Sequence, residues 1–313
     1  MKLQIVTPII DLDLLRSSHL ASYRLRLAYV YEAAKTLGID VIGGMTIQHA
    51  DLYYVGKLTS SFEAIEVDKT LSELSGRQVL VDYTDDWLDK PRDATHDIYS
   101  RLKNISNTFI TPVQELTEKL KQRGINGLSI PDGIDEFEQV APIAQKHNIP
   151  ELMWFGHSSN VDSLIKVLGS YLNQHKFNLH IVSDQHAFEL LRKVQFRTIP
   201  KCIIKAHLWS NETLIKVASN SDICIIPTNK IFASANRLVT ALNLGLPVLA
   251  DEIHSYSRLS SYFSTFSVSN IKKILSSPEE FHDTVRAGQK VVSEEFAKDK
   301  LIGLWVDLLK HYL

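Results

Sequence analysis

The sequence predicts an α/β fold made of two doubly wound, mostly parallel sheets, one in each of two domains. Its 313 residues exceed the size at which a single hydrophobic core usually stops growing. Short apolar, strand-like runs alternate with helical patterns along most of the chain, which is typical of parallel sheets. Hydrophobic content of 44% and charged content of 22% are those of an ordinary globular protein.

Residues 221–250 show the repeating unit most clearly. An apolar run ends at Pro227, because proline cannot donate to a strand ladder. Residues 228–233 then read as a loop, and Ser234 is a good N-cap for a helix that ends at Gly245. The next apolar strand follows directly. This unit places its loop and helix N-terminus at the carboxyl edge of the sheet, where open α/β sheets bind ligands.

Four side chains near this helix N-terminus suit a phosphate. They are Lys230 in the loop, Ser234 at the cap, and Asn236 and Arg237 in the first turn. A helix N-terminus offers unpaired N–H groups and the positive end of the helix dipole. Carboxylates are preferred in a first turn, so Arg237 indicates an anion that binds from outside. The alternative is that Arg237 pairs with a nearby Asp or Glu.

The N-terminal half reads as an opening strand–helix–strand unit followed by more of the same. Strands are predicted at residues 3–10, 40–43, 51–55, 78–82, 107–111 and 128–131, and helices over 23–37, 60–75, 93–104 and 113–123. Ser17, Ser18 and His19 lie in the loop after the first strand, with Arg24 and Arg26 near the helix start. These arginines either contact a ligand or form surface ion pairs.

The second half begins after residues 136–150, which contain two prolines and no clear period and are predicted to be a linker. A strand then leads to Gly156 and a loop with His157, Ser158 and Asn160. A lone loop histidine is usually a capping or solvated residue, and we keep that alternative beside a ligand role. Further strands are predicted at 178–183 and 202–205, and helices over 161–172, 210–219, 269–275, 278–287 and 294–311.

Several classes of protein are excluded or disfavoured. The formal net charge of −2 argues against a protein that grips duplex nucleic acid mainly through its phosphates. Cys202 and Cys224 both lie in apolar runs, which favours reduced thiols. The N-terminus does not read as a signal peptide and no segment reaches the length of a membrane span, so we expect a cytoplasmic protein, with peripheral membrane contact left open. No metal-ligand spacing or P-loop occurs.

Three motifs resemble GT-B glycosyltransferases, particularly the large retaining group called family 4 and its family 1-like relatives. Residues 222–250 match a "D-hhh-P" strand and a helix that ends "A-x-x-x-G-x-P-V-h-A". Residues 111–135, with Pro131-Asp132-Gly133, match "h-T-x-S…h-P-N-G-h-D", and residues 81–87 are similar to an "hhD-x-x-D" strand end. The resemblance spans nearly the whole chain in the right order.

The resemblance implies two Rossmann-like domains that face a cleft. Residues 1–135 would form the acceptor-side domain, 136–150 the linker, and 151–313 the donor domain, whose last helix would pack back on the first. The expected activity is metal-independent transfer of a sugar, without cofactor, from a UDP- or GDP-sugar to a glycan, lipid-linked or nucleic-acid acceptor. The resemblance places Gly156, His157, Ser158, Asn160, Trp209, Lys230, Ser234, Asn236 and Arg237 around the donor. Asp85, Asp86 and His19 are the candidate catalytic residues on the acceptor side, where Asp85 or Asp86 could deprotonate an acceptor hydroxyl or hold an acceptor sugar.

Two details leave alternatives open. Family 4 enzymes carry two glutamates eight residues apart that would fall at Phe232 and Thr240, and neither position is acidic. A non-catalytic nucleotide- or sugar-binding protein is therefore a second hypothesis, and a DNA-modifying glycosyltransferase is a third. Asp85 and Asp86 could instead cap the next helix, and Trp209 could be a core residue in place of a nucleobase wall.

Overall fold

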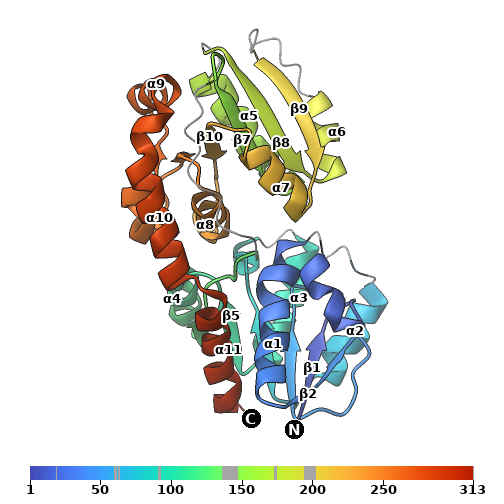
Figure 1. The fold of residues 1–313 in the computed structure, drawn as a ribbon. Coiled ribbons are helices and arrows are strands. Elements are labelled where there is room, and N and C mark those ends of the chain that lie inside the picture. The colour runs from blue at the N-terminus through green and yellow to red at the C-terminus, as the bar shows by residue number, and fades with distance from the viewer. Residues whose placement is uncertain are drawn as a thin grey trace. The chain divides into compact units, whose positions relative to one another are not determined.

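The computed structural model of the protein describes residues 1–18, 20–59, 62, 64–90, 93–135, 147–172, 175–193 and 202–312. The chain divides into two compact units (Figure 1). Unit 1 comprises Met1–Gly133 and Lys298–Leu313, and unit 2 comprises Ile134–Ala297. Each holds a six-stranded sheet whose neighbouring strands are parallel. The predicted pair of doubly wound parallel sheets is therefore confirmed.

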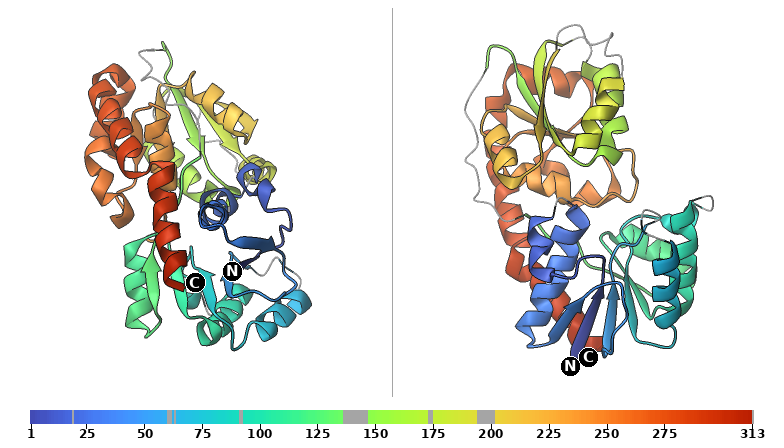
Figure 2. Two further views of the ribbon diagram at one scale, coloured as in Figure 1. Left: turned by 60° about the horizontal axis from the view of Figure 1, so that its bottom comes forward. Right: turned by 90° about the vertical axis from the view of Figure 1, so that its right-hand side faces the viewer.

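The strands of unit 1 lie in the order β2-β1-β3-β4-β5-β6. Their bounds are β1 Lys2–Val6, β2 Asp40–Gly43, β3 Leu52–Val55, β4 Val79–Asp82, β5 Thr108–Thr111 and β6 Gly127–Ser129. The helices are α1 Ala28–Thr36, α2 Ala64–Glu73, α3 Ala94–Ile105, α4 Gln114–Gln122 and α11 Lys298–Tyr312, with short turns η1 Leu12–Ser17, η2 Tyr23–Leu27 and η3 Trp87–Asp89. Helices α1 and α11 lie on one face of this sheet and α2 and α3 on the other (Figure 2).

The strands of unit 2 lie in the order β12-β11-β10-β7-β8-β9. Their bounds are β7 Glu151–Phe155, β8 Phe177–Ser183, β9 Cys202–Leu208, β10 Ile223–Ile226, β11 Val248–Ala250 and β12 Ser264–Thr265. The helices are α5 Val161–Val167, α6 Gln185–Lys193, α7 Asn211–Ala218, α8 Asn236–Asn243, α9 Val268–Ser276 and α10 His282–Glu295, with turns η4 Ser158–Asn160, η5 Leu168–Leu172, η6 His254–Tyr262 and η7 Pro278–Phe281.

The central strands β7, β10 and β11 of the unit 2 sheet are buried on both faces. Along β7, Leu152 and Trp154 join a core with α5 and α6, and Met153 and Phe155 join a second core with α7 and α8. Successive strand side chains point to opposite faces, so a strand covered on both sides must be apolar throughout. This is why the strands appear in the sequence as continuous apolar runs.

A buried ion pair lies in the core of unit 1. Arg26 donates from Nε to Asp82 Oδ1 at 2.5 Å and from Nη1 to Asp132 Oδ1 at 2.9 Å. Its side chain is 1% exposed, and the Trp305 ring of α11 lies 5.2 Å from its Cζ. Burial alone would lower the pKa of Arg26, but its interactions with Asp82, Tyr54 and Asp132 together outweigh burial and raise the pKa. The expectation that Arg26 forms a surface ion pair is wrong, and Arg24, 5% exposed, is buried as well.

Both places where the chain passes between the units are anchored on the η2–α1 segment. Gly133 donates its N–H to Leu25 O at 2.8 Å, and a Cβ at Gly133 would lie 2.0 Å from the Tyr29 ring. Lys298 Nζ lies 3.0 Å from Glu32 Oε2. A side chain cannot be accommodated at Gly133 without moving that ring, so the chain leaves unit 1 at a fixed position.

The helix predicted over 294–311 is confirmed for most of its length, but it begins at Lys298, because residues 294 and 295 belong to the preceding helix. Helix α10 ends at Glu295, with Phe296 as its C-cap, and α11 begins at Lys298. Phe296 packs against the core of unit 2, whereas α11 packs against α1 of unit 1. No helix among the residues described is long and apolar enough to cross a membrane.

Replacement of Arg26 by Ala is predicted to destabilise the protein strongly. It leaves Asp82, which is fully buried, without its ion-pair partner, and breaking a buried pair in this way costs about 3–5 kcal/mol. The free energy of unfolding in urea measures the loss. Arg101→Ala is the control, because the pair between Arg101 and Asp68 is exposed and should contribute less than about 1 kcal/mol. Equal effects of the two variants would contradict the prediction.

Candidate functional site

In each sheet, the strands that follow the first strand along the chain are added on one side of it, and the later strands are added on its other side. In unit 2, β7 has β8 on one side and β10 on the other, so the chain leaves these two strands in opposite directions. In unit 1 the corresponding pair is β1 and β3. Open α/β sheets bind ligands at the carboxyl ends of the strands at such switch points. The ends of β7 and β10 are therefore where unit 2 is expected to bind a ligand.

Gly156 directly follows β7 at this point. Its N–H donates to Val182 O at 3.2 Å, and its carbonyl accepts from Ser183 Oγ at 2.5 Å. A Cβ at Gly156 would lie 3.2 Å from Trp154 Cζ2 and 3.4 Å from Arg237 Nη1, which is tighter than usual packing. The absence of a side chain lets Arg237 approach the end of β7.

Arg237, the second residue of α8, spans the ends of the two strands. Its Nη2 donates at 3.1 Å to the carbonyl of Pro227, which follows β10, while its Nη1 lies beside Gly156. Among the residues described, no carboxylate lies within ion-pair distance of this guanidinium, so the alternative of an Asp or Glu partner is not found there. A half-buried positive charge therefore lies at the switch point without a neutralising anion from the described chain.

Three buried polar atoms around this point lack a hydrogen-bond partner in the described part of the chain: Arg237 Nη1, Trp154 Nε1 and Tyr256 Oη. Trp154 and Tyr256 are 0% exposed. Burial raises the pKa of Tyr256, and the charge of Arg237 opposes this rise, so the two groups lie within electrostatic range. An unsatisfied buried donor costs about 1–3 kcal/mol, and a phosphate oxygen or a water molecule would supply the missing acceptor.

The loop after β10 is held in one shape by hydrogen bonds. Thr228 donates its N–H to Asp251 Oδ2 at 2.7 Å, and Asp251 follows the neighbouring strand β11. Ser255 Oγ donates to Ala233 O at 2.6 Å. The half-buried Lys230 lies between Thr228 and Ala233, the two loop residues held by these hydrogen bonds. The predicted loop over residues 228–233 is confirmed.

The helix after this loop begins later than predicted. It starts at Asn236, and Ala235 occupies the N-cap position without a side-chain cap. Ser234 instead accepts the N–H of Asn236 on its Oγ at 3.2 Å. Ser234 therefore satisfies one of the first helix amides although it lies one residue before the cap.

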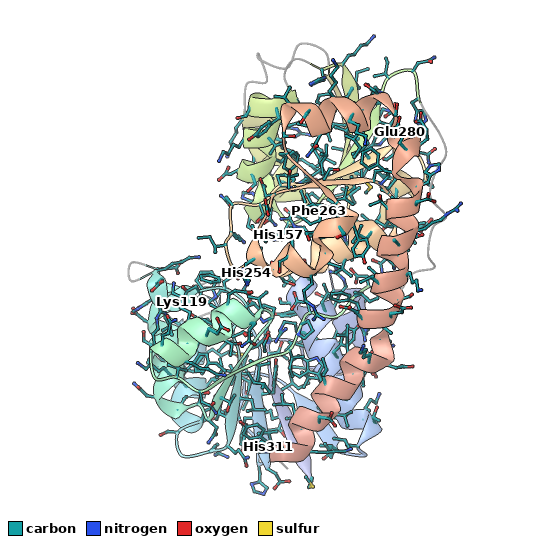
Figure 3. All side chains as sticks on the ribbon, turned by 90° about the vertical axis from the view of Figure 1, so that its left-hand side faces the viewer. Lys119, His157, His254, Phe263, Glu280 and His311 are labelled. Carbon is teal, nitrogen blue, oxygen red and sulfur yellow. The ribbon has the colours of Figure 1, made fainter. Side chains whose placement is uncertain are left out.

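The loop after β7 is also closed by local hydrogen bonds. His157, labelled in Figure 3, is the N-cap of η4, and its Nδ1 accepts from Ser159 N at 3.2 Å. Ser158 donates its N–H to Asp184 Oδ2 at 2.7 Å, and Asn160 Nδ2 donates to His157 O at 3.4 Å. The capping role of His157 is confirmed. A ligand role for His157, Ser158 and Asn160 stays a prediction.

Trp209 lies at the carboxyl end of β9. Its N–H donates to Ser183 O at 2.9 Å, and its half-buried ring packs against the core on the α7–α8 face. Ser210 caps α7 as predicted, accepting from Thr213 N at 3.0 Å. Core packing is thus confirmed for Trp209, and its contact with a nucleobase stays a prediction.

A row of polar side chains crosses the same sheet face. His180 Nε2 lies 2.9 Å from Glu151 Oε2, and His180 Nδ1 lies 3.1 Å from His207 Nε2. The two ring planes differ by 10° and their centroids lie 5.2 Å apart. The rings therefore lie side by side, and a single proton can form an N–H···N hydrogen bond between His180 Nδ1 and His207 Nε2. Partial burial, with the charges of His180 and Lys205, lowers the pKa of His207.

In unit 1, the predicted catalytic carboxylates follow β4 and are both paired. Asp85 Oδ2 lies 2.7 Å from Lys57 Nζ. Asp86 lies 2.5 Å from Lys119 Nζ, on α4 in Figure 3, and 3.2 Å from Arg123 Nη1. Asp86 makes no side-chain cap bond to η3, so the capping alternative is wrong for this residue.

His19 lies outside the described residues, as do residues 136–146 of the linker predicted over 136–150. Among the residues described, no group of three or more His, Cys, Asp and Glu could hold a metal ion.

Sequence reasoning missed Trp154, Tyr256 and Asp251. Trp154 reads as a core strand residue, and it is one. Only the contact of its ring edge with Gly156 brings it to the site. Tyr256 lies in η6, six residues beyond the motif over 222–250 and nineteen beyond Arg237, and no spacing in the sequence connects it to Arg237. Of these three residues, only Asp251 could have been recognised from the sequence, because it is the first polar residue after a predicted buried strand.

Comparisons with known proteins place this fold. No protein-family model matches the sequence, and no curated protein matches it at a significant level. Solved structures do match over the full chain. HepE of Anabaena, solved with UDP and glucose, has a TM-score of 0.65 at 12% identity and covers 99% of each chain.

Two other solved structures extend the comparison. The DNA-modifying enzyme β-glucosyltransferase, solved with and without uridine diphosphoglucose, has a TM-score of 0.65 at 12% identity and covers 100% of this chain and 99% of its own. AviGT4, a glycosyltransferase of avilamycin A biosynthesis, has a TM-score of 0.57 at 9% identity and covers 99% and 97%. The predicted GT-B fold of two Rossmann-like domains is confirmed.

Removal of the Asp251 carboxylate is predicted to loosen the loop after β10. Asp251→Ala leaves the Thr228 N–H without its acceptor. Hydrogen exchange of amides 228–233 should become faster by about tenfold, which corresponds to about 1.4 kcal/mol of lost protection. Exchange in β1 of unit 1 serves as the internal control. Unchanged exchange of the Thr228 amide would contradict the assignment.

Unit 2 is predicted to lose stability as the pH falls below about 6.5, the ordinary pKa of histidine. The lowered pKa of His207 means that the unfolded chain binds a proton more readily than the folded one, so acid favours unfolding. Urea unfolding at about pH 7.5 and about pH 5.5, near one unit to either side of that pKa, measures the loss. His207→Gln should lose less stability over this range, and an equal loss in both proteins would refute the prediction.

Proposed function

We propose that the protein is a glycosyltransferase that moves a sugar from a UDP- or GDP-sugar to an acceptor hydroxyl. The observation that carries this proposal is Arg237, a half-buried cation that joins the ends of β7 and β10 without a described carboxylate partner. A diphosphate would supply the missing negative charge. Solved proteins of the same fold that bind UDP or UDP-glucose support this choice of donor.

In this proposal unit 2 stabilises the leaving group. The bond between the anomeric carbon and the diphosphate oxygen breaks as the acceptor oxygen attacks, and negative charge grows on the departing nucleoside diphosphate. Arg237, Lys230 and the positive end of the α8 dipole would stabilise this charge. We propose that these positive groups make a metal ion unnecessary.

The rest of the nucleotide would extend along the strand ends. Hydrogen bonds join Gly156 to Ser183, and Ser183 to Trp209, so the ends of β7, β8 and β9 form a continuous edge. Neighbouring strands are ~4.8 Å apart, which places the end of β9 ~10 Å from β7. The half-buried ring of Trp209 would then pack against the nucleobase, and the η4 loop would contact the phosphates or sugar.

Unit 1 would hold the acceptor. We assign the contact with the acceptor hydroxyl to Asp85, because its side chain is 21% exposed whereas that of Asp86 is 9% exposed. Lys57 keeps the Asp85 carboxylate oriented through the 2.7 Å ion pair. Asp86 is better suited to holding α4 through Lys119 and Arg123 than to accepting a proton.

Two other functions differ from this proposal in what they require. A non-catalytic binder would explain the absence of acidic residues at Phe232 and Thr240. A DNA-modifying glycosyltransferase has support from the fold of β-glucosyltransferase. However, Lys57 after β3, Lys119 of α4 and Arg123 at the C-cap of α4 already pair with carboxylates, so they offer little positive charge to nucleic-acid phosphates.

We also propose a cytoplasmic location. Cys224 is a buried free thiol whose pKa is raised by its apolar surroundings, as expected in a reducing compartment. Contact with a lipid-linked acceptor at a membrane surface stays part of the proposal.

Nucleotide binding and turnover test the proposal together. Titration calorimetry with UDP and GDP measures binding, and release of free sugar from UDP- and GDP-sugars measures hydrolysis. Nucleotide binding with hydrolysis supports the glycosyltransferase. Nucleotide binding without hydrolysis or transfer supports the non-catalytic binder, and the absence of both overturns the proposal.

Arg237→Ala is predicted to weaken binding of the nucleoside diphosphate by more than tenfold, about 1.4 kcal/mol. The variant removes the charge that would pair with the phosphates, while α8 keeps its buried face. Calorimetry measures the change. Arg258→Ala is the control, since that side chain is 83% exposed in η6 and should not alter binding. Unchanged affinity in Arg237→Ala would refute the role of Arg237.

A further inference from the structure

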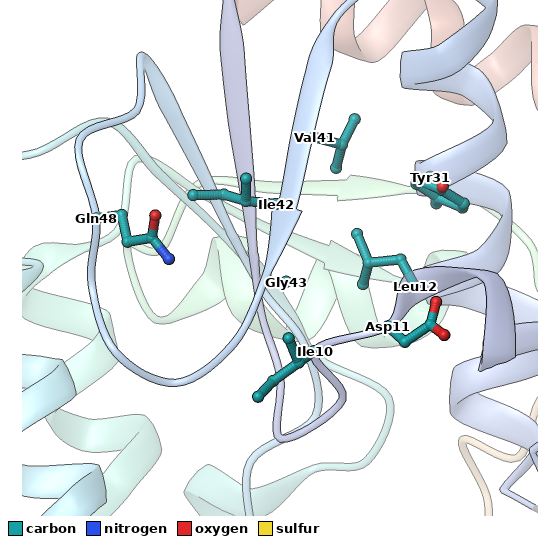
Figure 4. A pocket seen from close by; sticks show the side chains of 8 residues that line it. All are labelled: Ile10, Asp11, Leu12, Tyr31, Val41, Ile42, Gly43 and Gln48. Atoms are coloured by element: carbon teal, nitrogen blue, oxygen red, sulfur yellow. The ribbon is translucent and has the colours of Figure 1, made fainter.

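A pocket of about 340 Å³ opens at the outer edge of the unit 1 sheet (Figure 4). It lies along the edge strand β2 and is bordered by the loop that follows β1. Ile10 of that loop is 79% exposed although it is a large apolar residue. The pocket is at the carboxyl end of the sheet, the edge at which this fold class binds ligands.

The backbone of β2 supplies polar groups to this pocket. The amides of Asp40 and Gly44 donate to Met1 O and Ile5 O of β1, so alternate residues of the strand face inward. Val41 and Gly43 therefore turn their N–H and C=O groups outward, away from β1. An edge strand leaves such groups open to hydrogen bonds with another molecule.

The side chains around the pocket are of two kinds. Ile10, Val41 and Ile42 provide apolar surface, while Asp11, Gln48 and Tyr31 provide oxygen and nitrogen atoms. Among the described residues, Asp11 is the only charged one that lines the pocket, and one of its oxygens accepts the N–H of Asp13. None of the described lining residues is a cation, so a phosphate, sulfate or carboxylate would meet a negative charge there.

We propose that this pocket binds an uncharged saccharide. A sugar ring presents hydroxyl groups that both donate and accept hydrogen bonds, which suits the Asp11 carboxylate, the Gln48 amide and the outward groups of Val41 and Gly43. Its C–H surfaces suit Ile10 and Ile42. The inference rests on the proposed function, because it identifies the acceptor, or part of it, as a neutral glycan.

The same observations disfavour other occupants. Nucleic acid and a lipid-linked diphosphate both need positive charge, which the lining residues do not provide. An added peptide strand needs a long open edge, but β2 has four residues. The loop after β1 also crosses its end, since a Cβ at Gly43 would lie 2.7 Å from Ile9 O. A compact polar ring fits this short edge better than an extended chain.

Binding to an array of uncharged, sialylated and sulfated oligosaccharides tests the inference, followed by calorimetry with the best uncharged saccharide. We expect binding to uncharged members only. Ile10→Trp, which fills the mouth of the pocket at an exposed position, should weaken that binding by about tenfold or more. Ile65→Trp is the matched control, because Ile65 is 85% exposed on α2 and does not line the pocket.

Several outcomes would overturn the inference. They are no binding to any saccharide, binding only to anionic saccharides or to a short DNA duplex in a parallel anisotropy titration, and equal effects of the two tryptophan variants. Calorimetry with UDP separates this failure from failure of the proposed function. If UDP binds wild type and Ile10→Trp equally but no uncharged saccharide binds, only the saccharide site is wrong. If UDP does not bind at all, the proposed donor site is wrong.

Discussion

The parallel direction of the strands is the constraint on which the rest of the structure depends. Because the paired strands of each sheet run the same way, the loops and helix starts that follow them gather at one edge, where Gly156, Lys230 and Arg237 lie. Parallel sheets must also be covered on both faces, which accounts for the apolar strands and the flanking helices. Residues as distant in sequence as Gly156 and Arg237 meet only because β7 and β10 are neighbours.

The two edges differ in electrostatic character. At the end of β4 in unit 1, Asp85 and Asp86 are matched by lysine and arginine, so charge is neutralised within the protein. At the ends of β7 and β10 in unit 2, Arg237 donates to a backbone carbonyl and has donor capacity to spare. One edge is therefore suited to neutral hydroxyl groups and the other to an anion. This difference matches the division between acceptor and donor that a sugar transfer requires.

Sequence reasoning predicted the elements well where local chemistry decides them. Pro227 marked the end of a strand, and Gly245, with φ of +77°, follows the helix it was expected to end. The break at Phe296 could not be predicted, because neither glycine nor proline marks it and the reason is packing against a distant core. Arg26 was expected to contact a ligand or form a surface ion pair, and its buried partners Asp82 and Asp132 could not be predicted because they lie 56 and 106 residues away.

The candidate site was predicted in part for the same reason. The motif around residues 222–250 led to Arg237 and its loop, but the ring edge of Trp154 and the hydroxyl of Tyr256 come from core residues. Such residues have no sequence pattern of their own. Their role depends on which buried polar atom remains unsatisfied after folding, and that is a property of the packed structure.

Because α11 completes unit 1, the two units differ in when they can fold during synthesis. Unit 2 is one uninterrupted stretch, whereas unit 1 is made of two stretches separated by it. The ribosome therefore finishes unit 2 first, while the face of α1 that packs against α11 and pairs with Lys298 stays uncovered. Nascent unit 1 cannot complete its fold until α11 has been synthesised. During that interval, the uncovered face of α1 is the surface on which a chaperone would act.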